Sequence, residues 1–123
     1  MDNKKYCNLL VWNKAIDLVE LIYVVTSLFP KEEIYSLTNQ IRRAAVSIPS
    51  NLAEGASRSS LKEQIHFIEI AFGSLNELMC QLEISYSLNY ITSEQLERVE
   101  TQVKIVAQLM SGLKKSKEQE LAK

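Results

Sequence analysis

The sequence predicts an all-α protein: a single domain, residues 1–123, folded as an antiparallel, up-down-up-down, left-handed four-helix bundle. Apolar residues recur at alternating intervals of three and four along four segments, which is the spacing of one helix face and of left-handed helix packing. Only three glycines and two prolines occur in 123 residues, too few for the turns of an all-β fold. The segments are similar in length and their connections are short, which makes neighbouring helices antiparallel.

The first two helices are predicted at residues 8–29 and 31–54. Pro30 separates them, and the acidic residues that follow it suit the first turn of the second helix. Gly55 is expected to end the second helix. The predicted core residues are Val11, Ala15, Leu18, Ile22, Val25 and Phe29 in the first helix and Ile34, Leu37, Ile41, Ala44 and Ile48 in the second.

Pro49 lies inside the second predicted helix. A proline removes one helical hydrogen bond and disfavours helical geometry at the preceding residue, so the sequence predicts a kink at Pro49. The surrounding residues are small, and small side chains let helix backbones approach closely. They are Ala44, Ala45, Ser47, Ser50, Ala53 and Gly55.

The third and fourth helices are predicted at residues 60–89 and 93–117. Ser60 followed by Glu63 is a capping pattern for the third helix, and Thr92 or Ser93 is expected to cap the fourth. The charged C-terminal tail is expected to fray. The predicted core residues are Ile65, Ile68, Phe72, Leu75, Met79, Leu82 and Tyr86, followed by Leu96, Val99, Val103, Val106, Met110 and Leu113.

The first helix carries more apolar surface than the bundle core needs. A second apolar row runs beside the first, and the last helix has a smaller one. Exposed apolar patches mark interaction surfaces, so we expect self-association through Trp12, Ile16, Val19, Tyr23, Ile105 and Leu109. The alternative is a wide core face with a few exposed apolar residues.

The charge balance and the cysteines restrict the partners and the compartment. The net charge is −1, so no overall positive field attracts nucleic acid or anionic lipid. Cys7 and Cys80 lie far apart in the sequence and are expected to be free thiols, with a disulfide as the alternative. Charged residues interrupt the apolar N-terminal stretch, which argues against a secretory signal or a membrane span. We therefore expect a cytoplasmic protein without a membrane partner.

No catalytic site is predicted. Glu63 and His66 have the spacing of a pair of di-iron ligands, but that chemistry needs a second pair and His66 is the only histidine. His66 also falls outside the predicted core row. No glycine-framed nucleophile or phosphate-binding loop occurs. We therefore expect a non-enzymatic protein without cofactor or metal.

Basic residues are the remaining candidates for a binding site. Arg42 and Arg43 lie on the second predicted helix, and Arg58 and Lys62 at the next junction. These four residues are the candidate contacts for the phosphates of RNA or DNA. The alternative is a solvated helix surface with charge pairs, because Glu54 shares a helix stripe with Arg43, Ser47 and Ser50.

Several motifs together resemble the bacterial family of 23S rRNA-intervening sequence proteins, over about residues 10–113. The motifs are Val11-Trp12 with Ala15, Phe29-Pro30, Gln40 with Arg43-Ala44, Ser47-Ile48-Pro49, Asn51 with Glu54-Gly55, and Gly73-Ser74-Leu75 with Glu77. The resemblance implies a four-helix bundle that assembles into a homopentameric ring. The family is similar to the accessory variability determinant protein of diversity-generating retroelements, which binds nucleic acid and a reverse transcriptase. Those relatives are basic, whereas this chain is slightly acidic.

Two functions follow as hypotheses. The first is a homo-oligomeric, nucleic-acid-associated accessory factor that uses the four basic residues. The alternative is a ring-shaped scaffold for a protein partner, without nucleic-acid binding.

Overall fold

The computed structural model describes Tyr6 and residues 9–123. The prediction for Cys7, and the predicted start of the first helix at residue 8, lie outside the described residues. Cys80 is an exposed free thiol.

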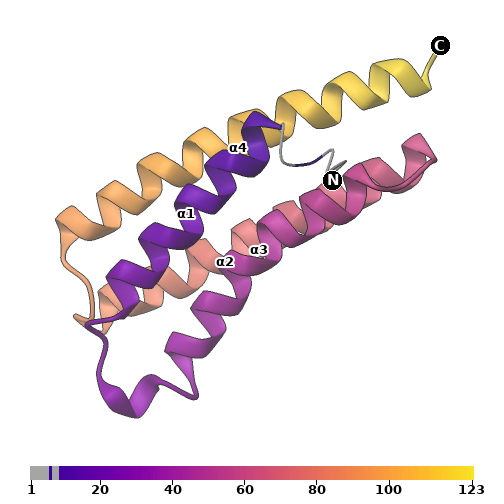
Figure 1. Cartoon of the computed structure of the whole chain (residues 1–123). Helices are drawn as coiled ribbons and strands as arrows, with labels where there is room; N and C mark the ends of the chain where they lie inside the picture. The colour runs from indigo at the N-terminus through magenta and orange to yellow at the C-terminus, as the bar shows by residue number, and fades with distance from the viewer. Residues whose placement is uncertain (1–5, 7–8) are drawn as a thin grey trace.

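The described chain contains four α-helices and no strand. They are α1 (Leu10–Thr26), α2 (Leu37–Ala56), α3 (Leu61–Ser87) and α4 (Ser93–Leu121), with a short 3-10 helix, η2 (Lys31–Glu33), before α2. Successive helices run in opposite directions (Figure 1). Each helix packs against the next, and α4 packs against α1, whereas the diagonal pairs make no close backbone approach within the described residues. The all-α four-helix bundle is therefore confirmed, and its left-handedness stays a prediction.

The predicted core rows of α1 and α4 are buried almost completely. All six predicted residues of the first helix are buried, and so are all those of the fourth except the half-buried Leu113. The core row of α3 is wider than predicted. It includes Ala71, Ser74, Leu78, Gln81 and Ser85, whereas Tyr86 is exposed. Small residues in this second row let α3 pack closely against α2.

The second predicted helix is wrong at its start, because residues 31–54 do not form one continuous helix. The chain makes one 3-10 turn after Pro30, and the backbone of Ser36 then leaves helical geometry (φ −127°, ψ −108°) before α2 begins at Leu37. Glu33 holds this break: one carboxylate oxygen accepts from the Leu37 N–H at 3.3 Å, and the other accepts from the Tyr90 hydroxyl at 2.8 Å. Ile34, predicted in the core, is consequently 52% exposed.

The end of α1 also differs from the prediction, which placed it at residue 29. The helix ends at Thr26, whose hydroxyl donates to the Ile22 carbonyl at 2.7 Å. The last three predicted residues form a turn in which the Phe29 N–H donates to the Thr26 carbonyl at 3.1 Å. The ring of Pro30 disfavours helical geometry at Phe29, so a helix that reaches this proline must end before it.

Gly55 does not end α2, as the sequence predicted, but lies within its last turn. A Cβ atom at this position would lie 2.9 Å from the Phe67 Cβ and 3.3 Å from the Gln64 carbonyl oxygen. Gly55 is therefore a point of close approach between α2 and α3, where a larger residue would require a neighbouring atom to shift. This agrees with the prediction that small residues bring the helices together.

The C-terminal tail is helical to Leu121, so α4 extends beyond the predicted end at residue 117. Two contacts to α3 hold the turn of α4 just before this extension. The Lys114 ammonium lies 3.3 Å from a Glu69 carboxylate oxygen, and Lys117 donates to the Gln64 side-chain oxygen at 2.8 Å. Figure 1 shows this part of α4 continuing past the start of α1, beside the α2–α3 hairpin.

The predicted caps are confirmed. The Ser60 hydroxyl accepts from the Glu63 N–H at 3.1 Å, and Thr92 with Gln95 forms a reciprocal capping box. Pro49 is buried within the continuous helix α2, and the kink predicted there stays a prediction.

No helix in the described part of the chain combines the length and the apolar character that crossing a membrane requires. The cytoplasmic location stays a prediction.

Candidate functional site

The structure divides the four candidate cations into two separate clusters. Arg42 and Arg43, the α2 arginine pair, lie near the start of α2, whereas Arg58 and Lys62, the turn cluster, lie where α2 joins α3. Arg43 is 13 residues from the last residue of α2, or roughly 20 Å along a helix that rises about 1.5 Å per residue. The four residues therefore do not form one patch within a single chain.

In the α2 arginine pair, Arg42 is fixed by α1 and Arg43 is free. The Arg42 Nε donates to the Thr26 hydroxyl at 2.9 Å, and its guanidinium lies over the Tyr23 ring, 4.5 Å from the centroid. Arg43 is exposed and has no ion pair within the described residues. Among the described residues no carboxylate forms an ion pair with either arginine, although Glu77 lines a neighbouring depression together with Arg43.

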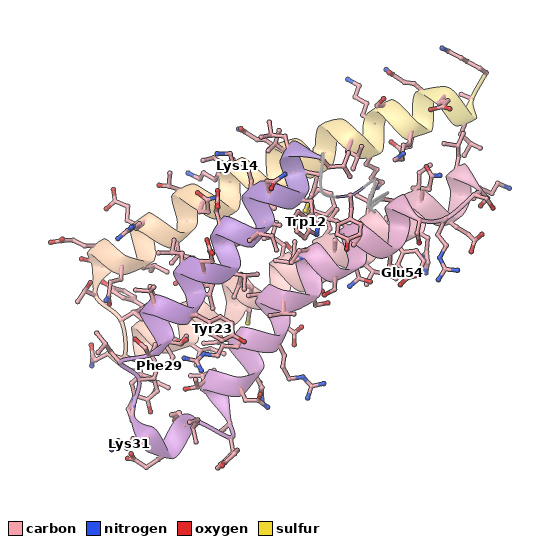
Figure 2. The ribbon with its side chains drawn as sticks, in the orientation of Figure 1. Trp12, Lys14, Tyr23, Phe29, Lys31 and Glu54 are labelled. Carbon is pink, nitrogen blue, oxygen red and sulfur yellow. The ribbon has the colours of Figure 1, made fainter. Side chains whose placement is uncertain are left out.

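In the turn cluster, Arg58 is paired with neighbouring carboxylates. Arg58 donates to a Glu54 carboxylate oxygen at 2.7 Å and lies 3.9 Å from a Glu63 oxygen, with its guanidinium over the Phe67 ring. Glu54 is labelled on the outer side of α2 in Figure 2. Lys62 is exposed. The structure thus supports the sequence-based alternative, a surface with charge pairs, at this cluster.

The second apolar row of α1 lies against α2 and lines a surface groove. Trp12, Ile16 and Val19 are half-buried, and Figure 2 shows Trp12 and Tyr23 on the side of α1 that faces α2. The groove has a volume of about 280 Å³. Its α2 wall consists of Val46, Pro49, Ser50 and Ala53. Much of the predicted interaction row is therefore accessible, and we call this depression the apolar groove.

The smaller apolar row of α4 lies elsewhere. Ile105 is 37% exposed and Leu109 is half-buried. Both share a helix face with Gln102, whose side-chain amide donates to the Lys14 carbonyl of α1 at 3.1 Å. This α4 ridge, Ile105 and Leu109, therefore borders the other flank of α1, with the exposed residues Asn13, Asp17 and Glu20 between the two apolar surfaces.

A polar seam joins α2 to α3. The Ser47 and Ser74 hydroxyls are 2.8 Å apart, and the Asn51 amide donates to the Ser47 carbonyl and hydroxyl at 2.8 and 2.9 Å. These side chains form hydrogen bonds with one another where α2 and α3 lie close together. Their contacts give them a structural role.

Glu63 and His66 make other contacts in the structure. The Glu63 backbone serves the cap of α3, and His66 is exposed with its ring edge-on to Phe67. No group of three or more potential metal ligands occurs among the residues that the structure describes.

The predicted site residues do not include three neighbours of the α2 arginine pair: Tyr35, Thr38 and Asn39. They line a second groove, of about 530 Å³, together with Tyr23, Ile34, both arginines, Val46 and Ser47. The break before α2 exposes Tyr35, and the sequence had assigned this stretch to a continuous helix. One of the two contacts that hold the break joins Glu33 to Tyr90, 57 residues away, and the local sequence does not reveal it.

Tyr90 is the one described residue with a clearly shifted pKa. Its hydroxyl donates a hydrogen bond to the Glu33 carboxylate, which raises the pKa of Tyr90 above its usual value, and desolvation adds to the effect. This contact lies at the end of the bundle and serves the fold.

Comparison with known proteins identifies the family. The model of the 23S rRNA-intervening sequence protein family matches residues 7–112. A crystal structure of a protein of unknown function, from the S23 ribosomal protein family of Bacteroides thetaiotaomicron, superposes with a TM-score of 0.79 at 25% sequence identity. The similarity covers 85% of this chain and 95% of that one. The curated proteins gave no match. With this fold and a match over most of its length, the chain belongs to the family of 23S rRNA-intervening sequence proteins.

Proposed function

We propose that the protein is a non-enzymatic accessory factor that assembles into a homopentameric ring and associates with nucleic acid. The observation that carries the nucleic-acid role is the α2 arginine pair, which forms no ion pair with a carboxylate in the part of the chain that the structure describes. Family membership and the resemblance described above support the ring.

Two distinct apolar surfaces favour a ring over a twofold dimer. A ring needs a head-to-tail contact between two different surfaces, whereas a twofold dimer pairs one surface with itself. The apolar groove between α1 and α2 is concave, and the α4 ridge lies beyond the polar strip of α1. In the proposed assembly, the α4 ridge of one subunit packs into the apolar groove of the next.

Assembly also compensates for the weak charge of a single chain. The chain carries a net charge of −1, so the two arginines of the α2 arginine pair bind phosphates weakly in a single subunit. A ring repeats the arginine pair in each subunit, and contacts made by one nucleic-acid molecule to several subunits reinforce one another. The proposed binding is therefore dependent on assembly and sensitive to salt.

The assembly is tested by light scattering of the wild type and of two lysine variants. Ile16→Lys places a charge in the apolar groove, whereas Asp17→Lys places the same side chain on the exposed strip one residue later. We expect a pentamer for the wild type and for Asp17→Lys, and a monomer for Ile16→Lys. A monomeric wild type at micromolar concentration would reject the assembly.

The nucleic-acid role is tested by fluorescence anisotropy with structured RNA and DNA at low salt. We expect affinity that falls as salt rises, because phosphate contacts release counterions. Absence of binding at tens of micromolar protein, or binding that is indifferent to salt, would reject the role.

The second candidate function is a ring-shaped scaffold for a protein partner. The observation that favours it is the pairing of Arg58 with Glu54 and Glu63, which removes one of the four predicted cations from a phosphate site. This candidate predicts an intact ring without nucleic-acid affinity, and a specific protein partner that stays bound after nuclease treatment.

A further inference from the structure

The larger groove beside the α2 arginine pair combines positive charge with aromatic rings. It is formed by the start of α2, the segment before it and the end of α1. Of the described residues that line it, only Arg42 and Arg43 are charged. Its volume of about 530 Å³ lies within the range of roughly 300–1,000 Å³ typical of small-ligand sites. The charge and the volume together favour an anionic ligand.

Arg42 is held in position for such a ligand. Thr26 binds its Nε, and Tyr23 lies under the guanidinium, while the two terminal nitrogens make no hydrogen bond within the described residues. A guanidinium presents paired donors that match the oxygens of a phosphate. Because Arg42 is already ordered, binding would cost little of its side-chain entropy.

Tyr35 provides an aromatic surface at the same groove. Its side chain is 93% exposed, which is unusual for a large aromatic residue without a partner. Asn39 also lines the groove, and its exposed side-chain amide has no hydrogen-bond partner within the described residues. The groove therefore offers a stacking surface and an unpaired amide next to two cations.

We propose that this groove binds an unpaired nucleotide. The arginine pair contacts the phosphate, and the base stacks on Tyr35, as bases stack on exposed aromatic residues in proteins that bind single strands. A base inside a duplex has both faces covered by its neighbours, so it is unavailable to Tyr35. This inference rests on the proposed nucleic-acid role and specifies its ligand as single-stranded.

The groove remains open in the proposed ring. It shares Val46 with the apolar groove but lies toward the start of α2, whereas Trp12 and Pro49 line the apolar groove. The centres of protein interfaces are depleted in charged residues, which places the arginine pair at the edge of the subunit contact.

The test compares three labelled ligands by fluorescence anisotropy at about 50 mM salt. They are a single-stranded RNA of about ten nucleotides, the matching duplex, and adenosine monophosphate. The variants are Tyr35→Ala, Tyr35→Phe, which keeps the ring, and the control Tyr86→Ala, which removes an exposed tyrosine of α3 outside the groove. Light scattering and circular dichroism verify that each variant is folded and assembled.

We expect the single strand to bind more tightly than the duplex and Tyr35→Ala to weaken single-strand binding at least about fivefold, the loss of one stacked base. Tyr35→Phe and Tyr86→Ala should bind as the wild type does. Mononucleotide affinity equal to that of the strand would support the site and identify a free nucleotide as its ligand.

Two outcomes would overturn the inference in distinguishable ways. If single strand and duplex bind equally and Tyr35→Ala changes neither, the inference fails while the nucleic-acid role stands. If none of the three ligands binds and structured RNA and DNA do not bind either, both fail. The inference would also be overturned if an acidic peptide displaced the labelled single strand as effectively as the unlabelled strand does. That result would show that charge alone selects the ligand.

Discussion

The α2 arginine pair and the turn cluster contain the same number of cations but differ in available charge. Arg42 and Arg58 each lie over an aromatic ring, with the guanidinium carbon 4.5 and 4.9 Å from the ring centroid. The difference lies in their polar partners. Arg42 is bound by a neutral hydroxyl, whereas Arg58 is bound by two carboxylates. A cation held by a neutral group keeps its charge for a ligand, and a cation held by carboxylates does not.

The largest expected effect separates the two clusters directly. The double variant Arg42→Gln/Arg43→Gln should weaken binding of single-stranded RNA at least about tenfold and reduce the slope of log affinity against log salt by roughly 1.4 per subunit engaged. The matched control Arg58→Gln/Lys62→Gln removes the same charge and should change the affinity less than about twofold. Equal losses in the two variants, measured by anisotropy titration, would contradict the distinction.

The next effect concerns the packing that places the turn cluster. Gly55→Ala inserts a methyl group against the Phe67 Cβ, whereas the control Gly73→Ala meets no atom within 4 Å. Both variants gain the same helix propensity. We therefore expect the free energy of unfolding of Gly55→Ala to be about 2 kcal/mol below that of Gly73→Ala in urea denaturation. Equal stabilities of the two variants would show that α2 and α3 move apart to accommodate the methyl group without loss of free energy.

Removing the carboxylates around Arg58 should make the charge of the turn cluster available to RNA, as that of the α2 arginine pair is. Glu54→Gln/Glu63→Gln removes both carboxylates near Arg58 and should strengthen RNA binding roughly threefold to tenfold at low salt. The control Glu83→Gln/Glu97→Gln makes the same change in net charge at exposed positions on α3 and α4. An equal gain in the control would mean that net charge, rather than the local pairs, limits binding.

The smallest effect tests whether the fixed position of Arg42 matters. Thr26→Val removes the hydroxyl that binds its Nε and should weaken binding about twofold, with a loss of stability of roughly 0.5–1.5 kcal/mol. Thr101→Val is the control, because Thr101 makes a similar bond to a backbone carbonyl, at 3.0 Å, without an arginine. Thermal unfolding and anisotropy should show binding reduced only in Thr26→Val.

The sequence predicted those parts of the fold that depend on local pattern. The core rows of α1 and α4 follow from apolar spacing, and the Ser60 and Thr92 caps from residues three positions apart. The break before α2 depends on Glu33 and Tyr90, 57 residues apart in the sequence, and the helical tail depends on contacts to α3. Such contacts exist only after the helices have packed.

The candidate site was predictable to the same extent. The sequence identifies all four cations, but it does not reveal that Thr26, on another helix, binds Arg42 through its hydroxyl. The sequence does indicate the ion pair of Arg58, because Glu54 lies four residues before it, a spacing at which opposite charges meet on a helix. Tyr35 could not be singled out, because its exposure follows from the unpredicted break.

The Glu33–Tyr90 hydrogen bond has a consequence for the local opening of the molecule. Glu33 also caps the first turn of α2, so that turn is tied to the connection between α3 and α4. Amide hydrogens at the start of α2 should therefore exchange together with those near Tyr90, rather than fray independently. The hydrogen bond raises the pKa of Tyr90 in the folded protein. The bond therefore contributes fully to stability below the ordinary tyrosine pKa of about 10, and this contribution is lost as the pH rises through the raised pKa of the folded state. Alkaline conditions should thus loosen this end of the bundle, and with it the segment that presents Tyr35, before the opposite end.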